Sequence, residues 1–211
     1  MNKIKCYELI ESTKIVPAIR ADSEEQALKI AKALHEGGVG SLEITMAVPG
    51  ADKVIAKLAE TYPQLAIGAG TVLDAYAAQK AVDAGASFIV GPCFRDDIVE
   101  VCKRYGVLSQ MGALTPSEVL HAYQAGADVV KLFPISQLGP SYLKGVKAIL
   151  PHIPIVVVGG INLDNFLSYL KAGASAVGVA SALVNRKLVK EGKFDEITTI
   201  AKKFVNAIKE M

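Results

Sequence analysis

The sequence has no tryptophan, three cysteines, three histidines and no apolar run of the roughly 18 residues that a membrane span needs. Its longest apolar run, Ile153–Val158, has the length of a strand. Cys6, Cys93 and Cys102 are odd in number and irregularly spaced, which favours reduced thiols over disulfides. The histidines lack the spacing of metal ligands. Neither a bound metal nor a membrane is therefore expected.

The charge pattern excludes further functions. The formal net charge is +2 with both signs interspersed, and no basic stripe or aromatic-interleaved patch predicts contact with nucleic acid. The first eight residues carry charges where a secretory signal would be apolar. We therefore expect a cytoplasmic protein that acts on a small molecule. Its chemistry should come from lysine, glutamate, arginine, threonine and backbone amides, without a cofactor.

Apolar runs alternate with amphipathic segments along the whole chain. The candidate strands are Ile15–Ile19, Ser41–Thr45, Ala66–Gly70, Ser87–Val90, Val107–Met111, Asp128–Phe133, Ile155–Val158 and Ala176–Val179. Helical patterns lie between them, for example in Ser23–Glu36, Ala51–Thr61, Ala75–Ala84 and Pro116–Ala125. This alternation predicts an α/β fold with a parallel sheet. Eight units in 211 residues leave about 26 residues each, which predicts a (β/α)8 TIM barrel with residues 1–211 as its single domain.

Glycines mark the expected helix ends. One precedes each even-numbered strand and suits a left-handed C-cap, at Gly37, Gly85, Gly126 and Gly173. Any α/β fold uses such caps, so a doubly wound open sheet stays an alternative. A dinucleotide site is not predicted, because Gly68-Ala-Gly70 has Leu73 where the fingerprint needs a third small residue.

Two strands carry charged residues that a barrel would bury. Alternation puts Glu43 on the same face as Ser41, and Lys131 on the same face as Val129. The outward face of each strand takes leucine and isoleucine to pack against helices. Glu43 and Lys131 should then point into the barrel near the C-terminal strand ends, where barrel enzymes hold their chemistry. The alternative is a buried ion pair that only fixes the barrel geometry, and such pairs stabilise weakly.

A buried lysine suits nucleophilic catalysis. The pKa of a free lysine, about 10.4, leaves almost no neutral amine at pH 7. Burial lowers the pKa of a lysine by up to several units and supplies the neutral amine that attacks a carbonyl. The protonated imine is an electron sink, and Glu43 can move the proton at the adjacent carbon, through a water. The pair predicts Schiff-base chemistry at Lys131.

Further polar groups follow the strand candidates. Arg20 follows the first strand and Thr71 the third, and Thr115-Pro116 should open a helix as N-cap and N1. Gly159-Gly160 follow the seventh strand, and Ser181 lies at a helix start after the eighth. Backbone amides in these last two loops form the usual phosphate site of a barrel, although glycine there also serves turns alone.

Five short motifs resemble, in order, those of the class I 2-dehydro-3-deoxy-6-phosphogluconate (KDPG) / 4-hydroxy-2-oxoglutarate (KHG) aldolase family. They are spread over nearly the whole chain, at Leu42–Thr45, Gly68–Thr71, Leu114–Pro116, Val130–Pro134 and Gly159–Ile161. The resemblance implies a lyase that cleaves KDPG to pyruvate and glyceraldehyde 3-phosphate, and KHG to pyruvate and glyoxylate. It also implies a homotrimer.

The resemblance implies a role for each candidate residue. Lys131 would form the imine, Glu43 would act as general acid and base, and Thr71 would contact the pyruvate carboxylate. Arg20 matches an arginine of many members at the end of the first strand and would bind an anionic end of the substrate. The phosphate would be held by Gly159, Gly160 and Ser181.

Two positions depart from the family pattern on the carboxylate side. Ala47 stands where many members have arginine, and Val158 where many have threonine. Val158 and the stretch 133–140 resemble 6-phosphogalactonate aldolases, so 2-dehydro-3-deoxy-6-phosphogalactonate is an alternative substrate. Alternatives of another class are a phosphate-binding isomerase or epimerase, and a non-catalytic phosphosugar-binding barrel. The intact set of Lys131, Glu43 and Thr71 argues against loss of catalysis.

Overall fold

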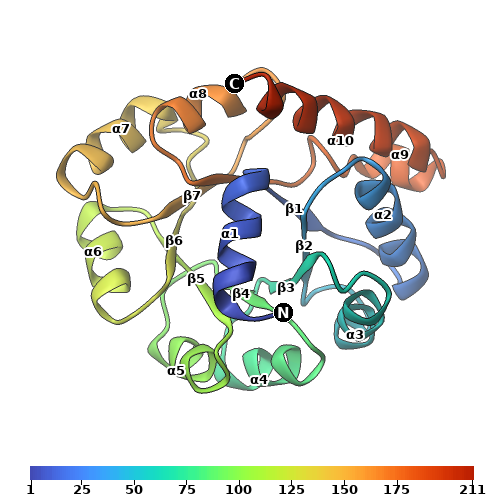
Figure 1. Ribbon diagram of the computed structural model, residues 1–211, viewed down its shortest axis with the longest axis horizontal. Helices are drawn as coiled ribbons and strands as arrows, with labels where there is room; N and C mark the ends of the chain where they lie inside the picture. The colour runs from blue at the N-terminus through green and yellow to red at the C-terminus, as the bar shows by residue number, and fades with distance from the viewer.

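The computed structural model describes all residues, 1–211, and its eight parallel strands close into a barrel in sequence order (Figure 1). The strands are β1 (Ile15–Ile19), β2 (Ser41–Thr45), β3 (Ala66–Gly70), β4 (Phe88–Val90), β5 (Leu108–Ala113), β6 (Val129–Leu132), β7 (Ile155–Val158) and β8 (Ala176–Val179). The last strand pairs with the first. The predicted (β/α)8 barrel is confirmed, and the open doubly wound sheet is excluded.

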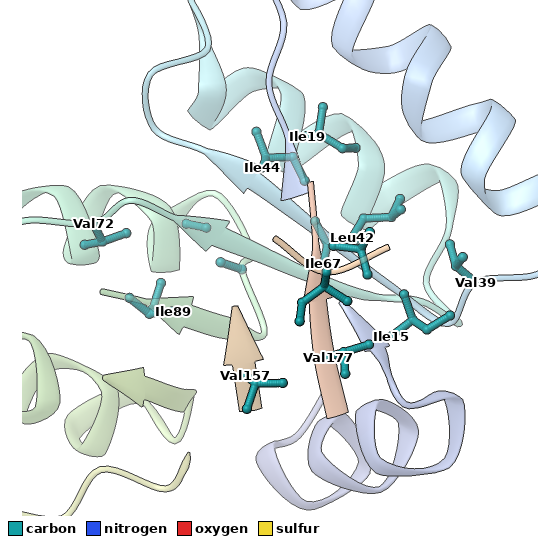
Figure 2. Close-up of a cluster of buried hydrophobic side chains, with 14 of the residues drawn as sticks. Ile15, Ile19, Val39, Leu42, Ile44, Ile67, Val72, Ile89, Val157 and Val177 are labelled. Atoms are coloured by element: carbon teal, nitrogen blue, oxygen red, sulfur yellow. The ribbon is translucent and has the colours of Figure 1, made fainter. Parts of the chain in front are cut away.

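Helices surround the barrel, as Figure 1 shows. They are α2 (Glu24–Glu36), α3 (Ala51–Thr61), α4 (Ala75–Asp83), α5 (Asp96–Tyr105), α6 (Pro116–Gln124), α7 (Gly139–Ile149), α8 (Phe166–Lys171), α9 (Arg186–Lys190) and α10 (Phe194–Lys209). The outward faces of the strands carry apolar side chains such as Leu42, Ile44 and Ile67, which belong to the core between sheet and helices (Figure 2). None of these helices combines the length with the hydropathy that a membrane-spanning helix needs.

One helix was not predicted. Helix α1 (Lys3–Thr13) lies across one end of the barrel, where Figure 1 shows it over the centre of the ring. Its buried residues Cys6 and Ile10 pack against inward side chains near the N-terminal strand ends, including Leu108 and Phe88. The helix therefore closes the N-terminal end of the barrel, and the opposite end stays available for a site.

Several predicted bounds were wrong for local reasons. Strand β6 begins one residue after Asp128, because the Asp128 carboxylate accepts hydrogen bonds from the backbone N and Oγ of Ser109, both at 2.9 Å. Strand β5 begins at Leu108, one residue after the predicted Val107. The N–H of Val107 instead donates a hydrogen bond to the carbonyl oxygen of Cys102, in the last turn of the preceding helix. Its end at Ala113 lies beyond the predicted Met111.

The helix ends follow the predicted glycine pattern with one correction. Gly38, Gly85, Gly126 and Gly173 have φ between 87° and 104°. The first of these was predicted at Gly37, which instead keeps φ −76° because its N–H continues the helical hydrogen bonding to Ala33. Thr115 caps α6 as predicted, in a reciprocal capping box with Glu118.

The strand register arranges the inward side chains in layers. In such a barrel the pairing is staggered around the ring, so that four side chains at one height come from alternate strands. One layer is built by the even-numbered strands from Glu43, Val90, Lys131 and Gly178. The layer beneath it is built by the odd-numbered strands from Val16, Gly68, Gln110 and Val156. The layer that holds the charged side chains of Glu43 and Lys131 therefore lies directly above a mostly apolar layer, on the side of the C-terminal strand ends.

Candidate active site

Glu43 and Lys131 face each other across the barrel. They share one interior layer, and their strands β2 and β6 lie on opposite sides of the eight-stranded ring. Glu43 is 6% exposed and Lys131 7%. The Lys131 Nζ forms no ion pair or hydrogen bond with the protein and lies 5.1 Å from the centroid of the Phe133 ring. The prediction that both charges point inward is confirmed, and the lysine nitrogen is free to react.

The environment of Glu43 suits a group that gains and loses a proton. Burial raises the pKa of Glu43 above its ordinary value of 4.5, although the positive charges of Lys131 and Arg20 act in the opposite direction. Its carboxylate lies over Gly70 on the neighbouring strand, which has no side chain to obstruct it. A carboxyl with a raised pKa holds its proton to a higher pH, as a general acid requires.

Thr71 stands at the end of β3 in a strained conformation. Its φ of 59° lies in the left-handed region, which residues other than glycine rarely adopt. Hydrogen bonds fix the chain on both sides, from Met46 N to Gly70 O at 2.8 Å and from Val72 N to Val90 O at 3.1 Å. Such strain persists only where the surroundings impose it, and it gathers at functional sites. The half-buried Thr71 is therefore held at the mouth of the barrel beside the Glu43 layer.

A cavity of about 590 Å³ opens at the ends of β1, β2 and β8. Because β8 pairs with β1, the cavity brings together Arg20 and Ser181, which are far apart in the sequence. Helix α9 adds Arg186 and Lys190, which the sequence analysis did not single out. None of these three cations forms an ion pair, although Asp22 also lines the cavity. This excess of positive charge suits an anionic ligand.

The loops after β7 and β8 present unused backbone donors. The N–H groups of Gly160, Ile161, Ser181 and Ala182 donate no hydrogen bond within the chain. Gly159 and Gly160 have φ of 109° and 70°, and a Cβ on Gly160 would lie 2.9 Å from the Cβ of Ser136. The prediction that Ser181 opens a helix was wrong, because it lies in a turn and α9 begins only at Arg186. Both loops still match the phosphate-binding ends of a barrel.

The carboxylate side of the site has fewer donors. Ala47 lines the cavity with Thr45 and Arg20 but offers no charge. The side chain of Val158 covers Gly178, where a Cβ would lie 2.6 Å from its Cγ2. No three histidine, cysteine, aspartate or glutamate side chains gather in a way that could hold a metal ion. The polar groups that the site presents include the lysine, the carboxylate, the cations and the backbone amides.

A (β/α)8 barrel with a buried lysine opposite a buried carboxylate has the architecture of a class I aldolase, a lyase that works through a Schiff base. Residues 6–200 match the family model "KDPG and KHG aldolase". The chain belongs to this family.

Individual relatives agree with this assignment. A 2-dehydro-3-deoxy-phosphogluconate aldolase of Treponema pallidum is 30% identical over 97% of this chain and 98% of its own length. A 2-dehydro-3-deoxy-6-phosphogalactonate aldolase of Escherichia coli is 31% identical over 80% of this chain and 83% of its own. Among solved structures, a KDPG aldolase from Legionella pneumophila with pyruvate captured as a covalent carbinolamine intermediate has a TM-score of 0.86. It is 28% identical and covers 93% of this chain and 96% of its own.

Proposed function

We propose that this enzyme cleaves KDPG to pyruvate and glyceraldehyde 3-phosphate, with KHG, which gives pyruvate and glyoxylate, as a second substrate. The observation that carries the proposal is the single interior layer that holds both Lys131 and Glu43. An unpaired lysine opposite a carboxylate of raised pKa supplies the nucleophile and the proton carrier of one reaction.

The reaction follows from these two groups. The neutral amine of Lys131 attacks C2 of the substrate, and the carbinolamine loses water to give a protonated imine. Glu43, through a water, takes the proton of the C4 hydroxyl as the C3–C4 bond breaks, and the electron pair of that bond moves into the imine. The aldehyde leaves, and the enamine takes a proton at C3 from Glu43. Water then hydrolyses the imine and releases pyruvate from Lys131.

We assign the two ends of the substrate to different groups. The phosphate is bound by Gly159, Gly160 and Ser181, and Arg186 and Lys190 line the same cavity as Ser181. Thr71 binds the pyruvate carboxylate, and Arg20 supports an anionic end of the substrate. The unpaired cations and unused backbone donors support the phosphate assignment.

A second candidate is cleavage of the C4 epimer, 2-dehydro-3-deoxy-6-phosphogalactonate. The Escherichia coli relative of that name and the valine at Val158 favour it. The imine chemistry is the same for both substrates, and only the direction of the C4 hydroxyl differs. The test is a coupled assay for pyruvate release from each purified epimer. A kcat/KM at least about tenfold higher for one of them identifies the substrate, since that ratio corresponds to about 1.4 kcal/mol of selective binding.

We further propose that residues 1–211 act as one aldolase domain that assembles as a homotrimer in the cytoplasm. The family resemblance supports the trimer, and the three free cysteines suit a reducing compartment. Sedimentation equilibrium tests the assembly, because a mass of one or two chains would exclude the trimer.

A further inference from the structure

Gln110 is a polar side chain in an otherwise apolar part of the barrel. It lies on the inward face of β5 and is 1% exposed. Its side-chain nitrogen is the one buried side-chain nitrogen or oxygen atom of the chain without a hydrogen-bond partner. A buried amide without a partner costs free energy that a methionine of similar shape would not cost. Packing alone therefore does not account for this residue.

The register places Gln110 directly beneath the layer of Lys131. The other members of its own layer have no side chain that can form a hydrogen bond: Val16, Gly68 and Val156. On the adjacent strand Gln110 pairs with Val129, while Lys131 pairs with Gly112 two residues further on. Lys131 is therefore the diagonal neighbour of Gln110 on the same face, within the reach of two long side chains.

Lys131 lacks a hydrogen-bond partner as well. Its nitrogen rests 5.1 Å from the centroid of the Phe133 ring. The stem of a lysine is flexible, so the nitrogen can turn from this ring toward the carboxamide. Two neighbouring polar side chains that both lack a partner point to a contact that forms during the reaction.

We propose that Gln110 is a positioning residue for the Lys131 nitrogen during imine formation, an inference that rests on the function proposed above. A half-turn of a carboxamide exchanges its oxygen and nitrogen without changing its shape, so the oxygen can face Lys131. It then accepts a hydrogen bond from an N–H of the neutral amine, whose lone pair stays aimed at C2. After the C–N bond forms and the carbinolamine hydroxyl leaves as water, the same oxygen accepts from the N–H of the protonated imine.

A neutral acceptor suits this step. A carboxylate at position 110 would hold Lys131 as an ammonium ion, which cannot attack a carbonyl. An apolar side chain would leave the imine N–H without an acceptor in a buried place. The charged acceptor, Glu43, extends over Gly70 instead and stays available for proton transfer.

The test compares the rate at which borohydride traps pyruvate in the unmodified enzyme, in Gln110→Met and in Gln124→Met. Gln124 is exposed at the end of α6, so it controls for the same chemical change outside the barrel. We expect Gln110→Met to trap at least about tenfold more slowly, equivalent to about 1.4 kcal/mol, with an equal or higher Tm. Gln124→Met should trap at the unmodified rate. Unchanged trapping by Gln110→Met overturns the inference, whereas no trapping by the unmodified enzyme contradicts the proposed function.

Gln110→Glu provides a readout that does not depend on the methionine variant. Glu43 and Arg20, the other charged groups that act on this interior, are unchanged in it. A carboxylate beneath Lys131 should move the pH profile of trapping to higher pH. A purely structural role would alter the Tm and leave this profile in place, and that result overturns the proposal.

Discussion

The carboxylate of Glu43 occupies the space that a side chain at Gly70 would fill. A Cβ built on Gly70 would lie 2.5 Å from the Cδ of Glu43. The backbone of Gly70 is not left-handed, so its conformation alone does not demand glycine. The glycine of β3 therefore makes room for the carboxylate that faces Lys131.

Gly70→Ala should fold and displace this carboxylate. We expect turnover to fall by about 10²-fold, the scale of general acid/base catalysis, while pyruvate is still trapped at Lys131. Gly145→Ala is the control, because nothing lies within 4 Å of a Cβ built there. That change, inside α7, should keep full activity and add up to about 1 kcal/mol of stability. Full turnover by Gly70→Ala would show that the carboxylate position is not critical.

Glu43→Gln separates imine formation from proton transfer. Glutamine keeps the shape of the side chain but cannot carry the proton, so turnover should fall by about 10²-fold or more while imine formation stays measurable. The exchange of pyruvate methyl protons with solvent, followed by NMR, is the most direct check. Exchange at a near-normal rate in the variant would mean that another group is the base.

The same variant should change how stability depends on pH. The pKa of Glu43 is raised in the folded protein, so the folded state binds this proton more tightly than the unfolded state does. Its stabilising contribution is full below the ordinary pKa of 4.5 and is lost as the pH rises through the raised value. Glutamine does not ionise in this range, so the Glu43→Gln variant has no such loss of stability as the pH rises. Urea unfolding should find the variant more stable than the unmodified enzyme at pH 7, with a difference that shrinks toward pH 4. A difference independent of pH would contradict this account.

The phosphate end should dominate substrate binding. Ala47 and Val158 remove two donors from the carboxylate side, each worth roughly 1–3 kcal/mol, while Arg186 and Lys190 stay unpaired in the cavity beside Ser181. We expect kcat/KM for the phosphorylated substrate to exceed that for KHG by at least about 10²-fold, or roughly 2.7 kcal/mol. Ser181→Asp should erase most of this preference and spare KHG.

Helix α9 offers a matched pair of changes for the same question. Arg186 lines the cavity, whereas the adjacent Lys187 does not and has an 81% exposed side chain. Arg186→Ala should therefore lower kcat/KM for the phosphorylated substrate alone, and Lys187→Ala should not. Equal kcat/KM values for the two substrates in the unmodified enzyme would mean that the phosphate assignment is wrong, or that Arg20 replaces the missing carboxylate donors.

The barrel and its central pair could be predicted because their signals are local. Alternation within one short strand is enough to turn Glu43 inward, and the same holds for Lys131. Helix α1 could not be predicted in this way, because only Cys6 and Ile10 of its residues are buried, and a single pair at i,i+4 is too little to establish a helical period. It is held by the barrel end that it covers.

The remaining site residues depend on closure of the ring. Arg186 and Lys190 lie in a lysine-rich segment typical of a solvated surface, and only the pairing of β8 with β1 brings them beside Arg20. The inward position of Gln110 could have been predicted, because Gln110 lies two residues after the inward Leu108 on the same strand. The sequence could not show that its amide has no hydrogen-bond partner, because the side chains of its layer come from four different strands.

Lys147 is the lysine most able to compete with Lys131. Burial lowers the pKa of its ammonium group. Its Nζ donates hydrogen bonds to the carbonyl oxygens of Pro151 and Ile153, both at 2.8 Å, from helix α7 outside the barrel. Because these hydrogen bonds hold the Lys147 nitrogen against the loop that follows α7, we expect no imine there.

The central claim is tested most directly by reducing the enzyme with borohydride in the presence of pyruvate and measuring the intact mass, followed by peptide mapping. We predict one pyruvate-derived group per chain, on Lys131. Lys131→Met should fold, take up no label and lose essentially all cleavage. Labelling at Lys144 or Lys147, or no labelling of the unmodified enzyme, would contradict the Schiff-base mechanism.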